Sequence, residues 1–201
     1  MKLLDILLEQ EKIKVLGPRR SREERQKNYI IATQKKIQQY IKDGSKGFLD
    51  LEGTPITSLP DNLTYVGGNL NLGYTQISSL PDNLEVEGYL ALYNTPITSL
   101  PDNLKVGEFL SLLGTPITSL PSDLKIGGGL DLGFSKITSL PDNLKVKASL
   151  NLYNTPITSL PNGLKVGGDL HLGNTPLSKK YTEEEIRKMV PGVKRDIYMF
   201  G

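Results

Sequence analysis

The chain has 201 residues, with 24 Lys or Arg, 22 Asp or Glu and no Cys. The length fits one domain or one elongated array, and the absence of cysteine excludes disulfides, thiolate metal sites and cysteine nucleophiles. The charge is uneven, because residues 1–46 hold 12 basic and 6 acidic side chains whereas residues 47–201 hold 12 and 16.

Residues 1–47 are expected to form an N-terminal helical cap. Within residues 1–15, a short and very apolar helix is predicted from Leu3, Leu4, Ile6, Leu7 and Leu8. Asp5 interrupts this apolar run and no small-residue cleavage site follows, so no signal peptide is predicted. No apolar stretch is long enough to span a bilayer. We expect a soluble protein of the cytoplasm or of a virion, whose first helix either caps the array or docks to a larger assembly.

The second half of this cap begins with SREE at residues 21–24, a capping box that predicts a helix to about Asp43, ended by Gly44. Three isoleucines lie on one face of this helix: Ile30, Ile37 and Ile41. A basic cluster surrounds its start: Arg19, Arg20, Arg22, Arg25 and Lys27. Contact with nucleic acid or an acidic partner is one interpretation, but no aromatic side chain is interleaved for base stacking. We favour a solvated helix start and do not expect nucleic acid as a partner.

A 20-residue repeat fills residues 48–178. The segment TPITSLPDNL stands at 54–63 and again at 95–104, and near-copies follow. Within each copy, the LxL pair alternates like a strand, and LP followed by DN predicts a chain reversal. Seven coils begin at Phe48, Asn69, Tyr89, Phe109, Gly129, Ser149 and Asp169. A fixed period of this length indicates a solenoid whose coils share one core.

The pattern LxLxxTxIxxLP resembles the core of the leucine-rich repeat family, in the short variety of bacterial and phage proteins. The resemblance implies an α/β solenoid with a parallel β-sheet on the concave face and irregular, polyproline-like segments outside. Where the family has a buried Asn, this chain has Thr or Ser, as at Thr95 and Ser135. We expect these hydroxyls to form a ladder that links neighbouring coils.

Residues 179–201 are expected to form a short C-terminal helical cap. TEEE at 182–185 is a second capping box. Ile186, Met189 and Val190 are predicted to close the last coil, and the final PGVKRDIYMFG is predicted to be an extended tail.

The sequence offers little for catalysis. His171 is the only histidine, and it stands between the leucines of its coil, as Asp131 and Asn151 do in the two coils before. No nucleophile or second carboxylate is expected on a neighbouring rung. We therefore predict no enzyme activity, no metal site and no cofactor.

The residues that flank the LxL pairs are more informative. Aromatic and apolar side chains gather in two adjacent coils, which is typical of binding surfaces. We predict a partner-binding patch of Tyr89, Tyr93, Phe109 and Leu113, with a polar flank of Asp131, Asn151, Asp169 and His171. The alternative is that these rings pack over the glycines of neighbouring coils or against the tail.

These observations favour a non-enzymatic module that binds a protein partner through the concave face. Two alternatives remain open. The chain could be a structural component of a larger assembly, such as a phage particle, docked through the N-terminal helices. Similar bacterial repeats also precede ubiquitin-ligase domains, so it could be an effector-like protein that lacks its catalytic domain.

Overall fold

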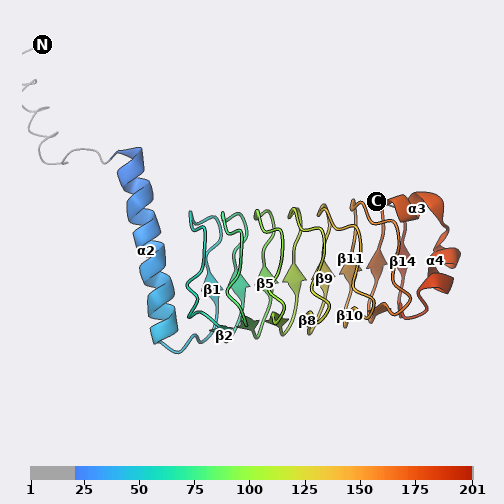
Figure 1. Cartoon of the computed structure of the whole chain (residues 1–201), viewed down its shortest axis with the longest axis horizontal. Coiled ribbons are helices and arrows are strands. Elements are labelled where there is room, and N and C mark those ends of the chain that lie inside the picture. Colours follow the sequence, from blue (N-terminus) through green and yellow to red (C-terminus); the bar gives the residue numbers. More distant parts are fainter. Residues whose placement is uncertain (1–20, 201) are drawn as a thin grey trace, which may run out of the picture.

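The computed structural model describes residues 21–200, which form a row of stacked coils with one helix at the N-terminal end and two short helices at the other (Figure 1). Each coil contributes a two-residue strand to one parallel sheet. Register partners from the second to the seventh strand are 20 residues apart, as Leu90 and Leu110 are, whereas Leu49 pairs with Leu70 and Leu170 with Ile197. The sheet runs in the order β1 (Leu49–Asp50), β3 (Leu70–Asn71), β5 (Leu90–Ala91), β7 (Leu110–Ser111), β9 (Leu130–Asp131), β11 (Leu150–Asn151), β13 (Leu170–His171) and β14 (Ile197–Tyr198). The predicted solenoid is confirmed.

The core is a column of apolar side chains enclosed by the coils. Both leucines of an LxL pair point into it, and Leu90 and Leu92 are fully buried. Ile97, Leu104 and Val106 of the same coil are buried as well. Burial of each large side chain contributes about 1.5–3 kcal/mol. Because one coil cannot enclose its own set, this energy is gained only when coils stack.

A left-handed backbone residue turns each coil after its sheet strand. This residue directly precedes the buried Thr or Ser, and its φ lies between 53° and 67° in Gly53, Tyr74, Asn94, Gly114, Phe134, Asn154 and Asn174. Gly adopts this conformation freely and Asn tolerates it. Tyr74 and Phe134 are bulky residues, for which it costs energy.

The turn places each buried hydroxyl beside a carbonyl of its own coil. Thr95 Oγ1 donates to the Leu92 carbonyl at 2.7 Å. The same bond is made by Thr54, Thr75, Thr115, Thr155 and Thr175. The predicted hydroxyl ladder between coils is therefore wrong, and the coils are joined by backbone hydrogen bonds instead, such as that from Leu90 N to Phe109 O at 2.8 Å. Ser135 Oγ is buried and has no hydrogen-bond partner among residues 21–200.

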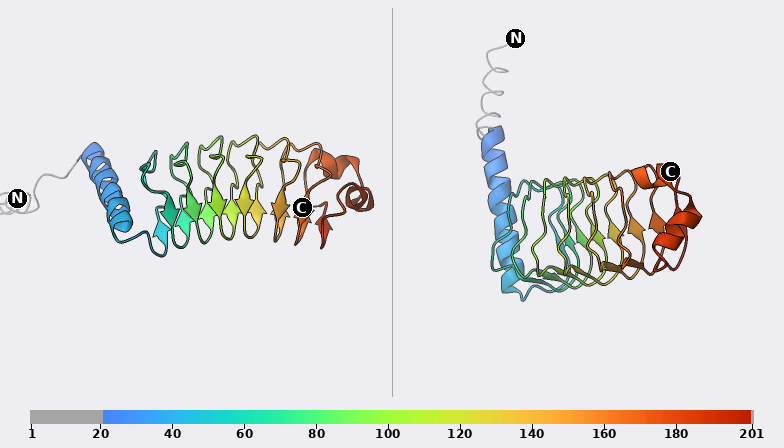
Figure 2. Two further views of the ribbon diagram at one scale, coloured as in Figure 1. Left: turned by 60° about the horizontal axis from the view of Figure 1, so that its bottom comes forward. Right: turned by 45° about the vertical axis from the view of Figure 1, so that its right-hand side comes forward.

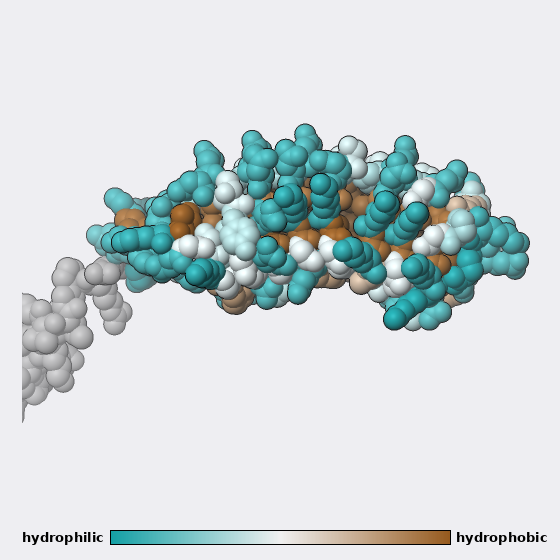
Figure 3. Space-filling view, turned by 90° about the horizontal axis from the view of Figure 1, so that it is seen from below, coloured by the Kyte–Doolittle hydropathy of each residue, from teal (hydrophilic) through white to brown (hydrophobic). Residues whose placement is uncertain are grey.

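A second parallel ladder runs where the family resemblance implies irregular segments. Its strands are β2 (Tyr65–Val66), β4 (Glu85–Val86), β6 (Lys105–Val106) and β8 (Lys125–Ile126), followed by the pair β10 (Lys145–Val146) and β12 (Lys165–Val166). Because the coils are equal in length, equivalent N–H and C=O groups of neighbouring coils lie side by side here and form hydrogen bonds, such as that from Gly107 N to Val86 O at 2.7 Å. This ladder lies on the underside of the view in Figure 1, where Figure 3 shows an apolar band bordered by hydrophilic side chains.

Helix α2 (Arg22–Lys42) lies across the first coil (Figures 1 and 2). The predicted capping box is present, with Ser21 Oγ accepting from the Glu24 N–H at 3.1 Å, and the helix ends before Gly44 as predicted. Ile37 is buried, Ile41 packs partly buried against the core, and Ile30 is half-buried. The C-terminal half of α2 therefore covers the open core. The helix predicted within residues 1–15 lies outside the described residues.

Two short helices close the other end. Helix α3 (Pro176–Lys180) begins inside the seventh coil, and α4 (Glu183–Met189) follows it. The second predicted capping box is present, with Thr182 Oγ1 accepting from the Glu185 N–H at 3.3 Å. Ile186 and Val190 are fully buried as predicted, but Met189 is 37% exposed, so its predicted place in the closure is wrong. Met189 is the last residue of α4, just before the chain turns at Pro191.

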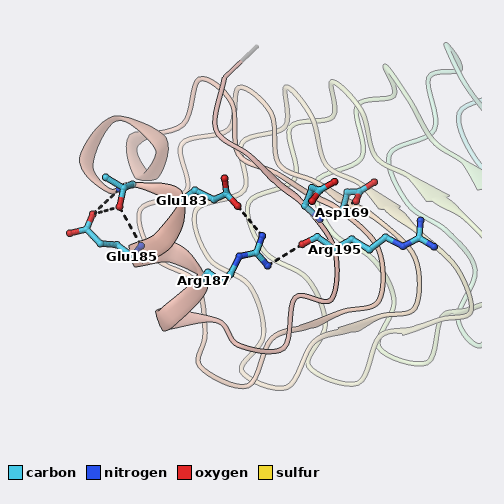
Figure 4. Close-up of polar contacts among 7 residues, drawn as sticks. Asp169, Glu183, Glu185, Arg187 and Arg195 are labelled. Carbon is cyan, nitrogen blue, oxygen red and sulfur yellow. Dashed lines mark hydrogen bonds and ion pairs between the residues drawn. The ribbon is translucent and has the colours of Figure 1, made fainter.

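The extended tail folds back as an eighth strand of the sheet. Strand β14 pairs in parallel with β13, and Leu170 N donates to the Asp196 carbonyl at 2.9 Å. Arg187 of α4 links this segment to the helix. Its guanidinium forms an ion pair with Glu183 of the same helix at 2.9 Å and donates a hydrogen bond to the Arg195 carbonyl of the tail at 3.1 Å (Figure 4). The tail therefore covers the strand edge that the last repeat would otherwise expose.

Candidate functional site

The surface of the eight-stranded sheet that faces away from the core, called the sheet face below, carries three side-chain positions on each of its eight rungs. Each rung has a pair of buried residues, which are leucines in the first seven rungs and Ile197 and Met199 in the eighth. Before this pair lie Phe48, Asn69, Tyr89, Phe109, Gly129, Ser149, Asp169 and Asp196. Within it lie Asp50, Asn71, Ala91, Ser111, Asp131, Asn151, His171 and Tyr198. After it lie Glu52, Gly73, Tyr93, Leu113, Gly133, Tyr153, Gly173 and Phe200. Seven of these 24 positions are aromatic, five are acidic and none is Lys or Arg. All eight residues of the predicted patch and its flank lie on this face.

The four apolar residues of the predicted patch lean in two directions. Tyr89 approaches Phe48 of an earlier rung, with ring centroids 6.3 Å apart. Phe109 lies instead over Gly129 of the next rung, and its Cδ2 is 3.0 Å from the position that a Cβ atom would take if Gly129 had a side chain. No ring contact joins Tyr89 to Phe109 within residues 21–200. The patch therefore divides between β5 and β7.

Tyr93 and Leu113 show the same division. The Tyr93 ring lies over Gly73 of the preceding rung and meets Tyr74 edge-on at 5.3 Å. Leu113 leans over Gly133 of the following rung. Burial, and after it the hydrogen bond to the Glu52 carboxylate, raises the pKa of Tyr93 to about 12. The predicted alternative, that rings pack over neighbouring glycines, thus describes part of the patch.

A hollow of about 160 Å³ opens beside Phe109 on the sheet face. Its lining consists of Phe109, Leu130, Asp131, Ser149, Asn151 and His171. Asp131 Oδ1 accepts the Gly133 N–H at 2.9 Å and the Asn151 side-chain amide at 2.8 Å, and Asn151 Oδ1 accepts the Tyr153 N–H at 2.9 Å. The structure therefore brings one predicted apolar residue together with three residues of the predicted polar flank, and it fixes their orientation.

The hollow holds Ser, His and Asp side chains, but they are not arranged for nucleophilic catalysis. Ser149 Oγ accepts from the Asp169 N–H at 3.1 Å, and no hydrogen bond joins it to His171 among the described residues. His171 stacks on Tyr198 and, in the part of the chain that the structure describes, is not hydrogen-bonded to Asp131. A relay needs both bonds to activate the hydroxyl. Among the described residues, the hollow therefore lacks the hydrogen bonds of such a relay.

Two sets of residues on or beside the sheet face are not among the predicted site residues. Asp196, Tyr198 and Phe200 belong to the tail, and the alternation of buried Ile197 and Met199 with these outward residues is the signal that could reveal them. Tyr74 and Phe134 occupy the left-handed turn position and are more than half exposed. Phe134 meets Tyr153 at 5.4 Å, as Tyr74 meets Tyr93. Their signal is an aromatic residue where other coils have Gly or Asn.

The second ladder carries a different chemistry. Lys105, Lys125, Lys145 and Lys165 follow one another in its strands, and a groove of about 580 Å³ runs along the first three. Lys105 pairs with Glu85 at 2.9 Å, whereas Lys125, Lys145 and Lys165 form no ion pair within residues 21–200. In the N-terminal basic cluster, Arg22, Arg25 and Lys27 are exposed on α2, and the other two arginines lie outside the described residues.

Residues 21–200 contain no group of three or more His, Cys, Asp or Glu side chains placed to hold a metal ion. In the same part of the chain, no helix has the length and apolar character needed to cross a bilayer.

No family model matches the chain, and no curated protein matches it. Among solved structures, the chain is similar to a leucine-rich-repeat protein of Leptospira interrogans, with 24% sequence identity and a TM-score of 0.38. The match covers 75% of this chain and 54% of that protein, so this chain spans about half of that protein's length. The function proposed below rests on the composition and geometry of the sheet face.

Proposed function

We propose that this chain is a protein-binding module and that the sheet face is its binding surface. The observation that carries the proposal is the gathering of aromatic side chains there. The chain has 13 aromatic residues, 4 Phe and 9 Tyr, and seven of them occupy the 24 positions of the sheet face. The leucine core inside the coils is complete without these rings, although Tyr93 and Phe109 also pack over glycines of neighbouring rungs. Exposed aromatic residues are the usual anchors of protein interfaces.

The rings differ in how much of their surface is free. Phe48, Phe109 and Tyr198 are 52%, 42% and 45% exposed, whereas Tyr89 and Tyr93 are half-buried. The exposed rings offer most of the surface that a partner can cover. Tyr93 serves in part to pack over Gly73.

The backbone supports binding by holding these rings on a fixed grid. Every rung is bonded to the next through main-chain hydrogen bonds, such as Leu110 N to Gly129 O at 3.0 Å. Seven steps of about 4.8 Å give a face roughly 34 Å long. Because this face is already ordered, the chain loses little conformational entropy when a partner docks on it.

The proposal is tested by truncating Tyr89 and Phe109 to Ala, with Lys125→Ala on the second ladder as the control. Because the rings lie outside the leucine core, each change should leave the melting temperature within a few degrees of the wild type. Recovery of the protein partner by the tagged chain from its source cell, identified by mass spectrometry, should fall for both aromatic variants. A true anchor weakens binding by about 2 kcal/mol or more, roughly thirtyfold in Kd.

Lys125→Ala should retain both the melting temperature and the partner. Aromatic variants that melt far below the wild type would show that the rings are packing elements. Variants that recover the partner in full would place the binding surface elsewhere.

A further inference from the structure

We infer that the segment bound by the sheet face is basic, and that one of its arginine side chains inserts into the hollow between Phe109 and Asp131. The inference rests on the proposed function, because it names the chemistry of the partner at the same surface. Three features carry it: the charge of the sheet face, the shape of the hollow and the unused bonding capacity of Asp131.

The sheet face carries charge of one sign. Lys and Arg make up 24 of the 201 residues, so 24 positions chosen at random would hold about three of them, yet the sheet face holds none. Its charged residues are Asp50, Glu52, Asp131, Asp169 and Asp196. Four lysines of the repeats, Lys105, Lys125, Lys145 and Lys165, stand on the second ladder instead. Lys36 of α2 reaches the edge of this face, where its Nζ donates to the Asp50 carbonyl, but carboxylates remain in excess. A surface with an excess of carboxylates attracts a basic segment and repels an acidic one.

The hollow accepts one long side chain. Its volume is about 160 Å³, and it is open to solvent on one side. Phe109, whose ring packs over Gly129, forms one wall of the hollow and has 42% of its surface exposed. An aromatic wall suits a planar guanidinium, which stacks on a ring face while its N–H groups remain available.

Asp131 supplies the acceptor at the side of this hollow. Its Oδ1 is held by the Gly133 N–H and the Asn151 amide, and no bond to Oδ2 exists among the described residues. The carboxylate is therefore oriented in advance with one oxygen free for a cation. An arginine that donates a charge-assisted hydrogen bond to this oxygen and stacks on Phe109 is held in both position and orientation.

The test uses fluorescein-labelled heptaarginine, with heptalysine and heptaglutamate as comparison peptides, and measures anisotropy against the full chain at low and moderate salt. Heptaarginine should bind most tightly, and its affinity should fall as salt rises, because the attraction is partly screened. Asp131→Asn should bind heptaarginine about tenfold more weakly, the loss expected for one bond to a charged group. The amide oxygen that this substitution introduces can still accept from Gly133 and Asn151, so the fold is kept.

Asp142→Asn is the matched control, since it removes the same charge from an exposed turn outside the sheet face. It should change the affinity less than twofold. In a nitrogen-15 correlation spectrum, heptaarginine should shift the Gly133 amide signal of the wild type and leave it in place in Asp131→Asn.

Equal weakening by both substitutions would overturn the insertion, because only diffuse attraction would then be acting. Tighter binding of heptaglutamate would also overturn the inference, and it would indicate that the lysines of the second ladder are the binding site. If no peptide binds, the basic partner is refuted, while the protein-binding proposal is still decided by partner recovery with the Tyr89 and Phe109 variants.

Discussion

Tyr198 stacks on His171, with ring centroids 4.6 Å apart and 15° between the ring planes. The two residues are register partners in β14 and β13, so the C-terminal tail supplies a full rung of the sheet face. This rung lies beside the hollow, which His171 lines. The C-terminal cap therefore shapes the proposed binding surface as well as closing the core.

Arg187→Gln should loosen this rung. The substitution removes the ion pair with Glu183 and the bond to the Arg195 carbonyl, which together hold the tail against α4. Such partly exposed contacts contribute about 1 kcal/mol. Hydrogen exchange at the Leu170 and Leu172 amides, which donate to the carbonyls of Asp196 and Tyr198, should accelerate about fivefold.

Lys188→Gln provides the control for this experiment. It removes an ion pair of similar length, 2.7 Å to Glu184, whose side chains are largely exposed. Exchange at both amides should stay unchanged. Equal acceleration in the two variants would show that the tail is held by packing alone.

Ser135→Thr should stabilise the protein. In the part of the chain that the structure describes, Ser135 is the one member of the buried Thr/Ser series whose hydroxyl makes no hydrogen bond. Threonine at six equivalent positions bonds the carbonyl three residues before it. A new bond and a buried methyl group together should add about 1–2 kcal/mol to the free energy of unfolding. Urea denaturation measures this directly. Ser135→Ala should be nearly neutral, and a large loss in that variant would mean that the hydroxyl is bonded after all.

Tyr93→Phe should alter the response to alkaline pH. Burial and the Glu52 carboxylate raise the pKa of Tyr93 to about 12 in the folded chain, whereas an unfolded tyrosine has a pKa of about 10. Between these values the unfolded state loses the proton and the folded state keeps it, so this tyrosine's contribution to stability is present below pH 10 and is lost as pH rises toward 12. Urea midpoints of Tyr93→Phe should therefore fall less steeply than those of the wild type from pH 10 to 11. Parallel curves would contradict the raised pKa.

The sequence predicts the scaffold better than the surface. The leucine period predicts the main sheet because every coil repeats the same in-and-out alternation. The boxes at Ser21 and Thr182 predict helix starts, since their side chains bond locally. The repeat does not predict the strand at Ile197, because this strand follows two helices and carries no LxL motif.

The direction of the rings depends on neighbours 20 residues away. Tyr93 has Gly73 before it and Leu113 after it, and its ring lies over the glycine. Phe109 has Tyr89 before it and Gly129 after it, and it leans the other way, again over the glycine. A ring thus fills the rung that lacks a side chain. This rule can be read from the sequence only once the register between coils is known.

The central claim, that partners bind the sheet face, is tested most directly by photo-crosslinking. Phe109 and Tyr65 are matched aromatic residues, 42% and 41% exposed, on the sheet face and on the second ladder. We would replace each in turn by p-benzoylphenylalanine and irradiate the chain in extracts of its source cell. A crosslinked protein partner obtained from position 109 and not from position 65 is the result we predict. Equal crosslinking from both positions, or crosslinking from position 65 alone, would contradict the claim.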